Sequence, residues 1–399
     1  ASGAVRLIMV LSPIAPIFAS YLIVESFNWL KKSKDETLKI LAIAIIIIII
    51  LSGLAVAYSF SSEIKRSAYN FVPSYYNQQW QKAMQWVRES TPKEAIFAHW
   101  WDYGYWVQSI GNRATVTDGG NAIVFWNYWM GRLVLTGDNQ KDSLDFLYSH
   151  NASYLLIDSS DIGKYGAFSS IGSNKDFDRY SWIGTFIIDE RQTQETNNQT
   201  LLVYTGGIAS DEDMVINNNG KEIILPGQRT GIGAIIIPII KSGNLTGFGQ
   251  PYIIAVYNGK QYKIDVRYLS VQNEFIDFQS GIEACPYVFP LIISEGDRVK
   301  QNPIGAVMYL SPRILRGYLA QKFILNDPFN KFPNFNLVHT EPNIIIDNLN
   351  SQGMNLPDFV YYQGVQGPIK IWNITYTGNE TFDLKYLEKD SSKYIDWAL

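Results

Sequence analysis

The first part of the chain contains two long apolar stretches. Residues Val5 to Leu30 are almost all apolar, and Leu38 to Phe60 include an unbroken run of isoleucine from Ile45 to Ile50. Each stretch exceeds the roughly 20 residues that a helix needs to cross a bilayer. A pair of buried core helices is the alternative, but the second stretch is apolar on every face, which favours a membrane span. The pattern therefore predicts two transmembrane helices within residues 1–62.

The linker between the two stretches indicates how they cross the membrane. It reads Lys31-Lys32-Ser33-Lys34-Asp35-Glu36, and an excess of lysine is typical of a cytoplasmic loop. The chain after residue 60 then lies outside the cytoplasm, as part of a multi-pass protein of the cell membrane. Five Asn-X-Ser/Thr sequons support the same side. They begin at Asn151, Asn198, Asn244, Asn373 and Asn379.

The part after the apolar stretches begins with a mixture of helix and strand signals. Apolar residues from Tyr75 to Ser90 recur at helical spacing, and Thr91-Pro92 ends the run. Ala95 to Ala98 and Tyr154 to Asp158 have the pattern of short buried strands. We therefore expect a mixed α/β core domain over residues 67–184.

After about Gly184 the pattern changes to β-rich runs separated by Gly, Asn and Pro. Asn217 to Gly220 and Asn258-Gly259 stand between such runs and predict hairpin turns. We expect a β-rich domain or insertion over 185–300. Residues 301–399, with a helix near Pro312 to Lys322 and more short strands, would complete the core. The predicted fold class is α+β, with two transmembrane helices, an extracytoplasmic mixed α/β core domain and a β-rich second domain.

Charge and composition narrow the possible functions. The net charge of −4 leaves no basic surplus to neutralise phosphates, so we expect no nucleic-acid partner. The one cysteine, Cys285, cannot form a disulfide within the chain, and the three histidines are far apart in sequence. We therefore expect no zinc site and assign no histidine a catalytic role. The aromatic content of 14% suits a core as well as a pocket for sugar or peptide.

An aromatic and acidic run follows the first predicted strand. It reads His99-Trp100-Trp101-Asp102-Tyr103-Gly104-Tyr105-Trp106. Two adjacent Trp side chains cannot both point into one core from a strand, so at least one should border a surface or cleft. Two indole N–H donors beside a carboxylate suit a hydroxyl group, which both donates and accepts. A Ser or Thr side chain fits this site, but an aromatic corner in which Asp102 caps a turn fits the residues equally well.

Trp100 to Gly104 resemble a known signature at every position. Trp-Trp-Asp-Tyr-Gly marks the catalytic subunits of oligosaccharyltransferases, and the flanking residues resemble the archaeal members. The resemblance implies an enzyme, acting as a single subunit, that transfers a glycan from a lipid-linked oligosaccharide to Asn in Asn-X-Ser/Thr of an acceptor polypeptide. It also implies that Trp100, Trp101 and Asp102 bind the Ser or Thr hydroxyl, supported by Tyr103 and Gly104.

A second pattern agrees with this family. Four residues at intervals of 0, +3, +7 and +10 lie on one face of a predicted helix: Asp161, Lys164, Phe168 and Ile171. They resemble the family's DK motif, an Asp and a Lys followed by Met or Ile, which lies beside the Ser/Thr pocket. The resemblance implies that Lys164 contacts the acceptor or supports the pocket, near Phe168 and Ile171. Phe168 departs from the usual Met or Ile, and a solvated Asp-Lys pair on a loop is the alternative.

The start of the chain, Ser2 to Leu7, resembles the outer end of the family's penultimate span. The resemblance implies that Arg6 binds the diphosphate of the lipid-linked donor, because guanidinium pairs well with phosphate oxygens. An Arg that snorkels to the headgroups is the alternative. The family also implies a divalent metal, Mn or Mg, with acidic ligands in amino-terminal loops. We therefore expect a carboxy-terminal portion with the last two spans, no catalytic or metal-binding residue, and no activity by itself.

Two other classes of protein stay open. One is a membrane-anchored extracytoplasmic protein that binds carbohydrate or peptide without catalysis, and such a protein would lack the acidic loops of the family. The other is a structural cell-surface protein, in which Trp100 to Gly104 would be buried and inaccessible.

Overall fold

The computed structural model describes two compact units, residues 1–75 and 76–399. The described residues are 14–32, 34–70, 76–218, 220–242, 245–272, 274–296 and 298–389. The stretch around Arg6 and the first residues of the first predicted span lie outside these ranges. The predicted role of Arg6 therefore stays a prediction.

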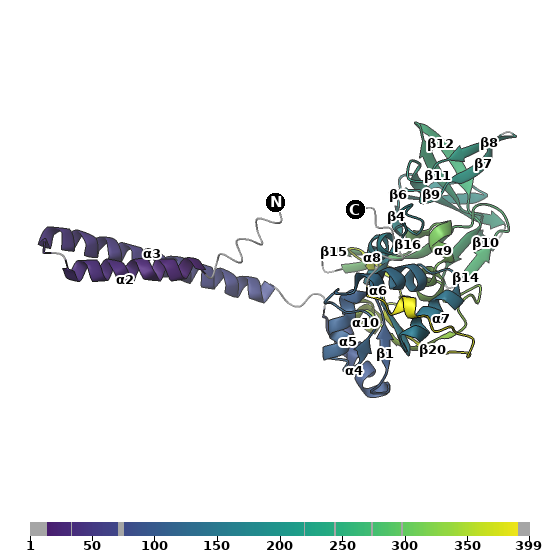
Figure 1. Ribbon diagram of the computed structural model, residues 1–399. Helices are drawn as coiled ribbons and strands as arrows, with labels where there is room; N and C mark the ends of the chain where they lie inside the picture. Colours follow the sequence, from purple (N-terminus) through teal and green to yellow (C-terminus); the bar gives the residue numbers. More distant parts are fainter. Residues whose placement is uncertain are drawn as a thin grey trace. The chain divides into compact units, whose positions relative to one another are not determined.

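The first unit is a pair of helices that lie side by side, α2 (Ile14–Lys32) and α3 (Glu36–Asn70) (Figure 1). Large apolar side chains are exposed along both helices, for example Phe18, Leu54 and Val56. Exposed apolar surface of this extent suits lipid tails better than water. Of the helices in the described ranges, one segment, Ile46–Ala68 of α3, is long and apolar enough to cross a membrane. The length and composition of this segment support the second predicted span. The first predicted span and the orientation of the chain in the membrane stay predictions.

A five-stranded mixed sheet forms the centre of the second unit. Its strand order is β17-β20-β3-β1-β2. Strand β1 (Ile96–Ala98) is parallel to both β2 (Ala114–Thr115) and β3 (Tyr154–Asp158), whereas β20 (Ile369–Ile374) is antiparallel to β3 and to β17 (Phe335–Glu341). Because β1 and β3 are parallel neighbours, their carboxyl ends meet at the same edge of the sheet. The residues that follow them, Trp100 onward and helix α8 (Ser160–Ile171), are therefore brought together.

Helices surround this sheet, and most of those expected from the sequence are present. The helix predicted up to Ser90 is α4, where Asn77 caps the first turn by accepting a hydrogen bond from Trp80 N (3.1 Å). The helix predicted over Pro312 to Lys322 is two shorter pieces, because Gly317 adopts an extended conformation between them. The helical elements are α4 (Gln78–Ser90), η1 (Trp101–Tyr103), α5 (Gly104–Ser109), α6 (Val124–Trp129), η2 (Met130–Leu135), α7 (Gln140–Ser149), α8 (Ser160–Ile171), α9 (Pro312–Arg316), η3 (Leu319–Ile324), α10 (Ile344–Ser351) and η4 (Leu384–Tyr386).

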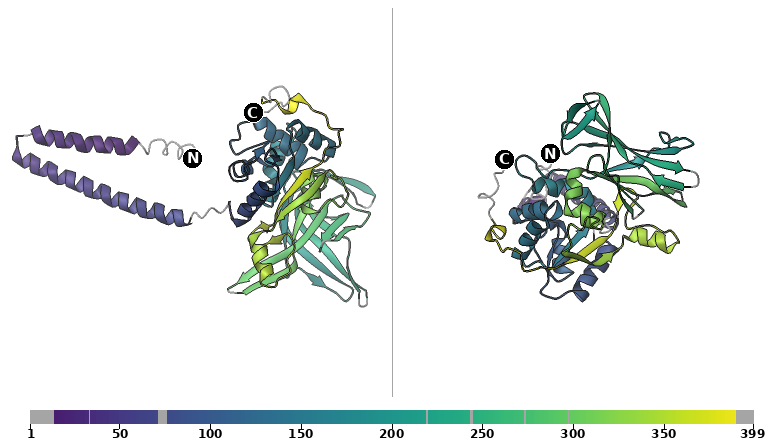
Figure 2. Two further views of the ribbon diagram at one scale, coloured as in Figure 1. Left: turned by 90° about the horizontal axis from the view of Figure 1, so that it is seen from below. Right: turned by 90° about the vertical axis from the view of Figure 1, so that its right-hand side faces the viewer.

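The β-rich runs predicted after Gly184 are strands of a 13-stranded sheet. Its strands gather on one side of the unit, and the helices of residues 78–171 lie on the other (Figure 2). Asn258 and Gly259 have positive φ angles of 49° and 72° at the turn between β11 and β12, as the Asn-Gly hairpin signal predicts. The strands are β4 (Gly184–Ile188), β5 (Gln194–Glu195), β6 (Gln199–Ala209), β9 (Gly231–Ser242), β10 (Leu245–Phe248), β11 (Tyr252–Tyr257), β12 (Lys260–Asp265), β13 (Tyr268–Val271), β14 (Glu274–Asp277), β15 (Cys285–Glu295), β16 (Arg298–Leu310), β18 (Val360–Tyr361) and β19 (Val365–Gln366).

The second predicted hairpin, β7 (Met214–Asn218) and β8 (Lys221–Leu225), forms a small sheet of its own. The structure thus confirms that the chain contains a mixed α/β part and a large β-rich sheet, as the sequence predicts. Both sheets belong to one compact unit, and the division at residues 184 and 300 stays a prediction.

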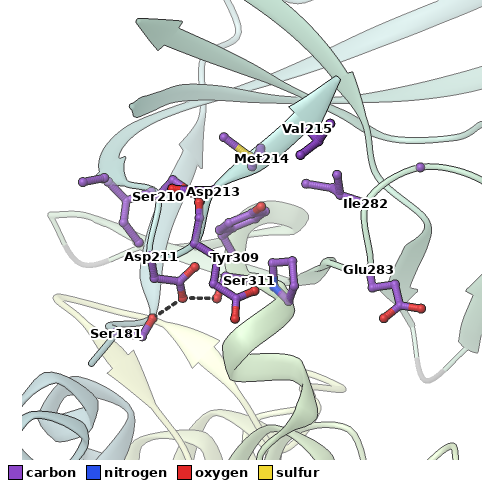
Figure 3. A pocket seen from close by; sticks show the side chains of 15 residues that line it. Ser181, Ser210, Asp211, Asp213, Met214, Val215, Ile282, Glu283, Tyr309 and Ser311 are labelled. Atoms are coloured by element: carbon purple, nitrogen blue, oxygen red, sulfur yellow. Dashed lines mark hydrogen bonds between the residues drawn. The ribbon is translucent and has the colours of Figure 1, made fainter. Parts of the chain in front are cut away.

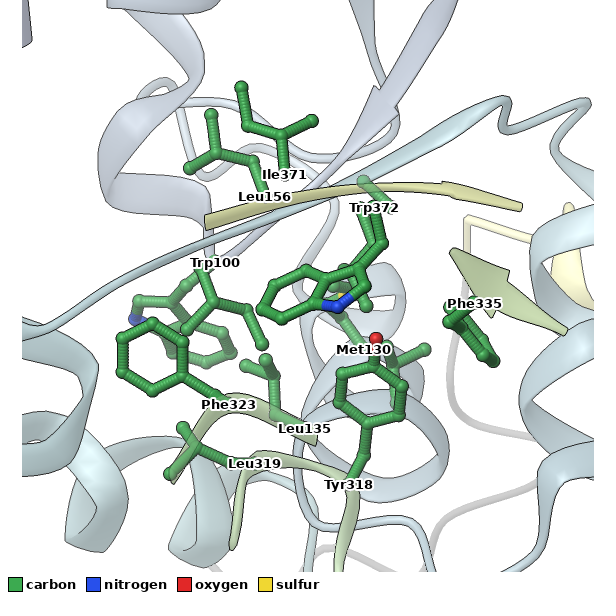
Figure 4. Packing of buried hydrophobic residues seen from close by; sticks show 14 of the residues in the cluster. Trp100, Met130, Leu135, Leu156, Tyr318, Leu319, Phe323, Phe335, Ile371 and Trp372 are labelled. Atoms are coloured by element: carbon green, nitrogen blue, oxygen red, sulfur yellow. The ribbon is translucent and has the colours of Figure 1, made fainter. Parts of the chain in front are cut away.

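The largest apolar cluster packs against the five-stranded sheet and includes Trp100. Figure 4 shows Trp100 in the same cluster as Tyr318, Phe323 and Trp372. Full burial of one such aromatic side chain contributes about 2–3 kcal/mol of hydrophobic free energy. A second cluster, which includes Phe186 and Tyr309, lies in the β-rich part. The Trp-Trp-Asp motif is therefore anchored in the main core by its first residue.

Two glycines let helix α8 touch the π-helical segment η2 backbone to backbone. A Cβ atom on Gly131 would lie 2.5 Å from the Phe168 carbonyl oxygen, and one on Gly172 would lie 2.5 Å from the Arg132 nitrogen. Real Cβ atoms do not approach backbone this closely, so both positions require glycine. This contact fixes the carboxyl end of α8.

The replacement Gly172→Ala should lower the free energy of unfolding by about 1–3 kcal/mol, because backbone atoms must move to accept the methyl group. Gly163→Ala on the same helix is the matched control, since nothing lies within 4 Å of its Cβ position. The control should gain about 0.5–1 kcal/mol from better helix propensity. Urea unfolding of the full chain in detergent measures both changes. If Gly172→Ala is as stable as the unchanged protein, the close contact does not exist.

Candidate functional site

The Trp-Trp-Asp motif occupies a sharp turn at the carboxyl end of β1. Trp100 precedes the 3-10 helix η1, and α5 begins immediately afterwards at Gly104. Trp100 is only 2% exposed and meets the ring of Phe168 edge to face, with centroids 5.6 Å apart. Trp101 is half-buried, and the Asp102 side chain is 27% exposed. One Trp therefore belongs to the core and the other borders the surface, as the sequence predicts.

His99 holds the backbone of this turn from inside. Its Nδ1 lies 2.8 Å from the Trp100 carbonyl oxygen, and the Thr117 hydroxyl donates to the His99 carbonyl (2.8 Å). Complete burial lowers the pKa of His99 to about 4, so the ring is neutral at pH 7 and donates from Nδ1. His99 therefore has a structural role here.

Gly104 allows a neighbouring loop to approach the motif. A Cβ atom at Gly104 would lie 2.4 Å from Cα of Asp118, which no other residue could accommodate without a backbone shift. The same loop lines a small cavity of about 70 Å³ together with Asn121 and Trp126. The glycine of the signature is thus explained by close packing against residues 117 and 118.

Lys164 of helix α8 joins the two predicted motifs directly. Its Nζ lies 2.7 Å from Oδ2 of Asp102 and donates a hydrogen bond to the Tyr103 hydroxyl (3.0 Å). The Lys164 side chain is about one-third exposed, so the ion pair is at the edge of solvent. The helical interpretation of the Asp-Lys pattern is confirmed, since α8 runs unbroken through both of its internal glycines.

The Tyr103 hydroxyl is the centre of the network. It donates to Oδ1 of Asp161 (2.6 Å), accepts from Lys164, and lies 3.0 Å from Oγ of Ser160. Asp161 is completely buried, and its Oδ2 accepts from the backbone N–H of Asp158 (3.2 Å). Two residues that the sequence assigned to motif support, Tyr103 and Asp161, are therefore in direct contact.

Burial sets the protonation of this network. Loss of water around Asp161 raises the pKa of its carboxyl to about 7, although the nearby Lys164 charge opposes the rise. Burial also raises the pKa of Asp158 and of the Tyr103 phenol. At pH 7 the phenol is neutral and available as a donor, and Lys164 balances the charge of Asp102.

The remaining predicted residues are placed differently. Phe168 is completely buried beneath Trp100, and Ile171 is half-buried beside the Phe125 and Tyr128 rings. Phe168 is inaccessible to a bound peptide in this conformation and could act only by supporting the pocket. The assigned role of both residues in acceptor binding stays a prediction.

Sequence reasoning missed the part played by Ser160 and Asp158. The backbone N–H of Ser160 donates to Oδ1 of Asp158 (2.7 Å), which closes the turn between β3 and α8. An Asp at the end of a buried strand was the available signal, because its side chain readily accepts from the backbone N–H two residues later. The hydrogen bond from Tyr103 to Asp161 had no sequence signal, because 58 positions separate the two residues.

Lys164 pairs with Oδ2 of Asp102, and no hydrogen bond is found among the described residues for Oδ1 of Asp102 or for the indole N–H groups of Trp100 and Trp101. Indole donors and a carboxylate acceptor on the same turn suit a group that both accepts and donates, such as a hydroxyl. The partial exposure of Asp102 also argues against a sealed structural corner.

The described part of the chain offers no metal site. Among those residues, no group of three His, Cys, Asp or Glu side chains is close enough to hold an ion. The divalent metal implied by the family resemblance, with ligands in amino-terminal loops, stays a prediction.

Comparison with known proteins finds related sequences. The dolichyl-phosphooligosaccharide-protein glycotransferase 1 of Pyrococcus horikoshii is 27% identical over 224 residues, which cover 52% of this chain and 22% of that protein. The protein of the same name from Pyrococcus furiosus is 31% identical over 165 residues, 39% of this chain and 16% of that protein. No family model matches the chain. The matched part is thus about a fifth of the length of these relatives.

A solved structure shows a weaker likeness. The carboxy-terminal globular domain of an oligosaccharyltransferase from Pyrococcus abyssi has a TM-score of 0.33 and 15% identity, and covers 74% of this chain and 50% of that one. This TM-score is too low to define a shared fold.

The sequence matches define the class to which the chain is related, the oligosaccharyltransferases, which are glycosyltransferases. Within that class, the chain is similar to a portion of the archaeal dolichyl-phosphooligosaccharide-protein glycotransferases of Pyrococcus. The relationship to oligosaccharyltransferases expected from the sequence is thus supported by these matches, and the assignment of the signature to Trp100 to Gly104 stays a prediction.

The raised pKa of Asp161 predicts a dependence of stability on pH. Below pH 4 the carboxyl is protonated in the folded and unfolded chain. Between about pH 4 and 7 only the folded chain keeps the proton, so the unfolding free energy contributed by Asp161 falls as the pH rises. Asp161→Asn cannot titrate. The difference in unfolding free energy between the unchanged protein and this variant should therefore decline across that window.

Urea unfolding at several pH values measures this difference, and the groups common to both proteins cancel. A difference that stays constant from pH 4 to 7 would show that the Asp161 carboxyl is not shifted. A difference that grows with pH would show a shift in the opposite direction.

Proposed function

We propose that this chain is the acceptor-recognition part of an oligosaccharyltransferase, in the carboxy-terminal portion of the enzyme. Trp100, Trp101 and Asp102 bind the hydroxyl of Ser or Thr in the Asn-X-Ser/Thr sequence of an acceptor polypeptide. The observation that carries this proposal is the turn after β1, where two indole side chains adjoin the Asp102 carboxylate that Lys164 holds at 2.7 Å.

The arrangement is suited to discriminate a hydroxyl from its absence. A Ser or Thr hydroxyl would accept from an indole N–H and donate to Oδ1 of Asp102. A side chain without a hydroxyl would leave these polar groups desolvated and unpaired, which costs about 1–3 kcal/mol for each group. The preference for Ser or Thr would therefore come from two effects. A hydroxyl makes new hydrogen bonds, and its absence leaves polar groups of the protein without a partner.

Lys164 and the residues beneath it prepare this pocket before the acceptor arrives. The 2.7 Å ion pair fixes one oxygen of Asp102, so the other oxygen has a defined position. The Tyr103 hydroxyl accepts from the Lys164 ammonium and is itself held by Asp161, and Phe168 supports the Trp100 ring. Groups that are already oriented lose little further entropy on binding.

The rest of the reaction belongs to this proposal as well. The names of the relatives support a lipid-linked oligosaccharide as the donor. The proposal also includes a contact between Arg6 and the diphosphate of the donor, and a divalent metal. It further places residues 76–399 outside the cytoplasm, in a multi-pass membrane enzyme that acts as a single subunit. Because the matched region is about a fifth of the relatives' length, transfer of the glycan would need more than the residues described here.

The proposal predicts that the full chain in detergent binds a labelled Asn-X-Thr peptide at least about tenfold more tightly than its Asn-X-Ala counterpart, which corresponds to ~1.4 kcal/mol. Asp102→Ala should abolish this preference because it removes the acceptor for the hydroxyl. Trp101→Phe should reduce it, since one N–H donor is lost while the ring remains. Fluorescence anisotropy at high protein concentration measures all of these affinities.

Asp142→Ala is the matched control, because Asp142 is an exposed residue of α7 outside the network. It removes one carboxylate and should leave the preference for Thr unchanged. If the unchanged protein binds both peptides equally, or if Asp102→Ala still prefers Thr, the pocket is wrongly assigned.

A further inference from the structure

Two adjoining cavities lie beyond the carboxyl end of α8. The inner cavity has a volume of about 320 Å³ and the outer one about 780 Å³, and both are lined by Asp211, Glu212 and Asp213. Together they reach the size range of sites for small organic ligands. Figure 3 shows the inner cavity, with the Asp211 carboxylate at its base between Ser181 and Ser311.

The outer cavity has an aromatic wall. The Phe177 side chain is 56% exposed, and its ring lies 6.0 Å from that of Tyr180. Phe177 also has a positive φ angle of 54°, which is uncommon for a bulky residue and costs about 1–2 kcal/mol. An exposed apolar ring in a strained backbone conformation is unfavourable for folding alone. Such strain points to a functional site.

The loop that carries this wall is held firmly. Nη1 of Arg313 donates to the carbonyl oxygens of Phe177 (3.0 Å) and Tyr180 (2.9 Å). Arg132 forms a two-pronged pair with Asp178, at 3.0 and 2.8 Å. The aromatic wall is therefore fixed in place before any ligand binds, which reduces the entropic cost of binding.

The inner cavity has polar groups in its lining. Tyr309, which is only 2% exposed, contributes its side chain to this lining. Oδ2 of the buried Asp211 accepts from the hydroxyls of Ser181 (2.5 Å) and Ser311. These hydroxyl and carboxyl groups can bind a ligand that is rich in both donors and acceptors.

The charges around the cavities favour a neutral ligand. Asp211 and Asp213 line both of them, and Asp176 adds an exposed carboxylate to the outer one. Glu212 is already paired with Arg313 and Arg316. An anionic ligand would be repelled, whereas neutral hydroxyl groups would find carboxylate acceptors.

We propose that the two cavities form a binding site for a neutral saccharide. The apolar face of one sugar ring stacks on Phe177, and its hydroxyls reach Asp213 and Gln228. The neighbouring ring enters the inner cavity and meets Tyr309 and Asp211. This inference does not depend on the proposed acceptor pocket, because it uses none of the residues of that pocket.

The test is isothermal titration of the full chain in detergent with four neutral disaccharides, cellobiose, maltose, mannobiose and N,N′-diacetylchitobiose. Glucuronic acid is the anionic comparison. At least one neutral disaccharide should bind saturably, and Phe177→Gly should weaken that binding by about tenfold or more. Glycine keeps the positive φ angle without strain, so this variant should fold as stably as the unchanged protein.

Phe382→Ala is the matched control, because Phe382 is similarly exposed, at 53%, and lines neither cavity. It should bind the disaccharide like the unchanged protein. The inference is wrong if no neutral disaccharide binds saturably, if only glucuronic acid binds, or if Phe177→Gly binds as well as the unchanged protein.

A glycopeptide that carries the same disaccharide on Asn distinguishes two possible ligands, a glycan linked to protein and a free saccharide. Tighter binding of the glycopeptide than of the free disaccharide would assign a protein-linked glycan, and equal binding would assign the saccharide alone. Both results support the site. Loss of saccharide binding in Phe177→Gly with unchanged preference for the Asn-X-Thr peptide would show that the two sites are separate.

Discussion

The parallel pairing of β1 with β3 is the constraint on which the site depends. Phe97 pairs with Tyr154 and Ala98 with Leu155, so the two strands end at the same edge of the sheet. The chain leaves β1 directly into Trp100 and leaves β3 directly into α8. Two motifs that are about 60 residues apart in sequence therefore meet within hydrogen-bond distance, as the Tyr103–Asp161 contact shows.

The buried network beneath the pocket explains how a charged group can be held at this edge. An isolated carboxylate in the position of Asp161 would be costly, and its raised pKa expresses that cost. The Tyr103 hydroxyl and the Lys164 ammonium reduce the cost and at the same time orient Asp102. The orientation of the partly exposed Asp102 carboxylate thus depends on Lys164 and, behind it, on the buried Tyr103 and Asp161.

Helix α8 connects the two proposed binding sites. Its first turn carries Asp161 and Lys164, and the loop after its last turn carries the Phe177 ring. Twelve residues of α-helix extend over about 18 Å. Because Gly131 and Gly172 fix the far end of the helix by direct backbone contact, the spacing between the two sites is a rigid property of the fold. An acceptor polypeptide and a saccharide could then occupy opposite ends of one element.

The sequence by itself determined the elements with strong local signals. The strand from Tyr154 to Asp158, the Asn-Gly turn at Asn258 and the family signature at Trp100 to Gly104 each depend on neighbouring residues, and all are present. Only the tertiary structure decided the partners across the chain. The ion pair of Asp102 with Lys164, the burial of Phe168 and the approach of Asp118 to Gly104 depend on strand pairing and packing between distant segments, for which local periodicity has no signal.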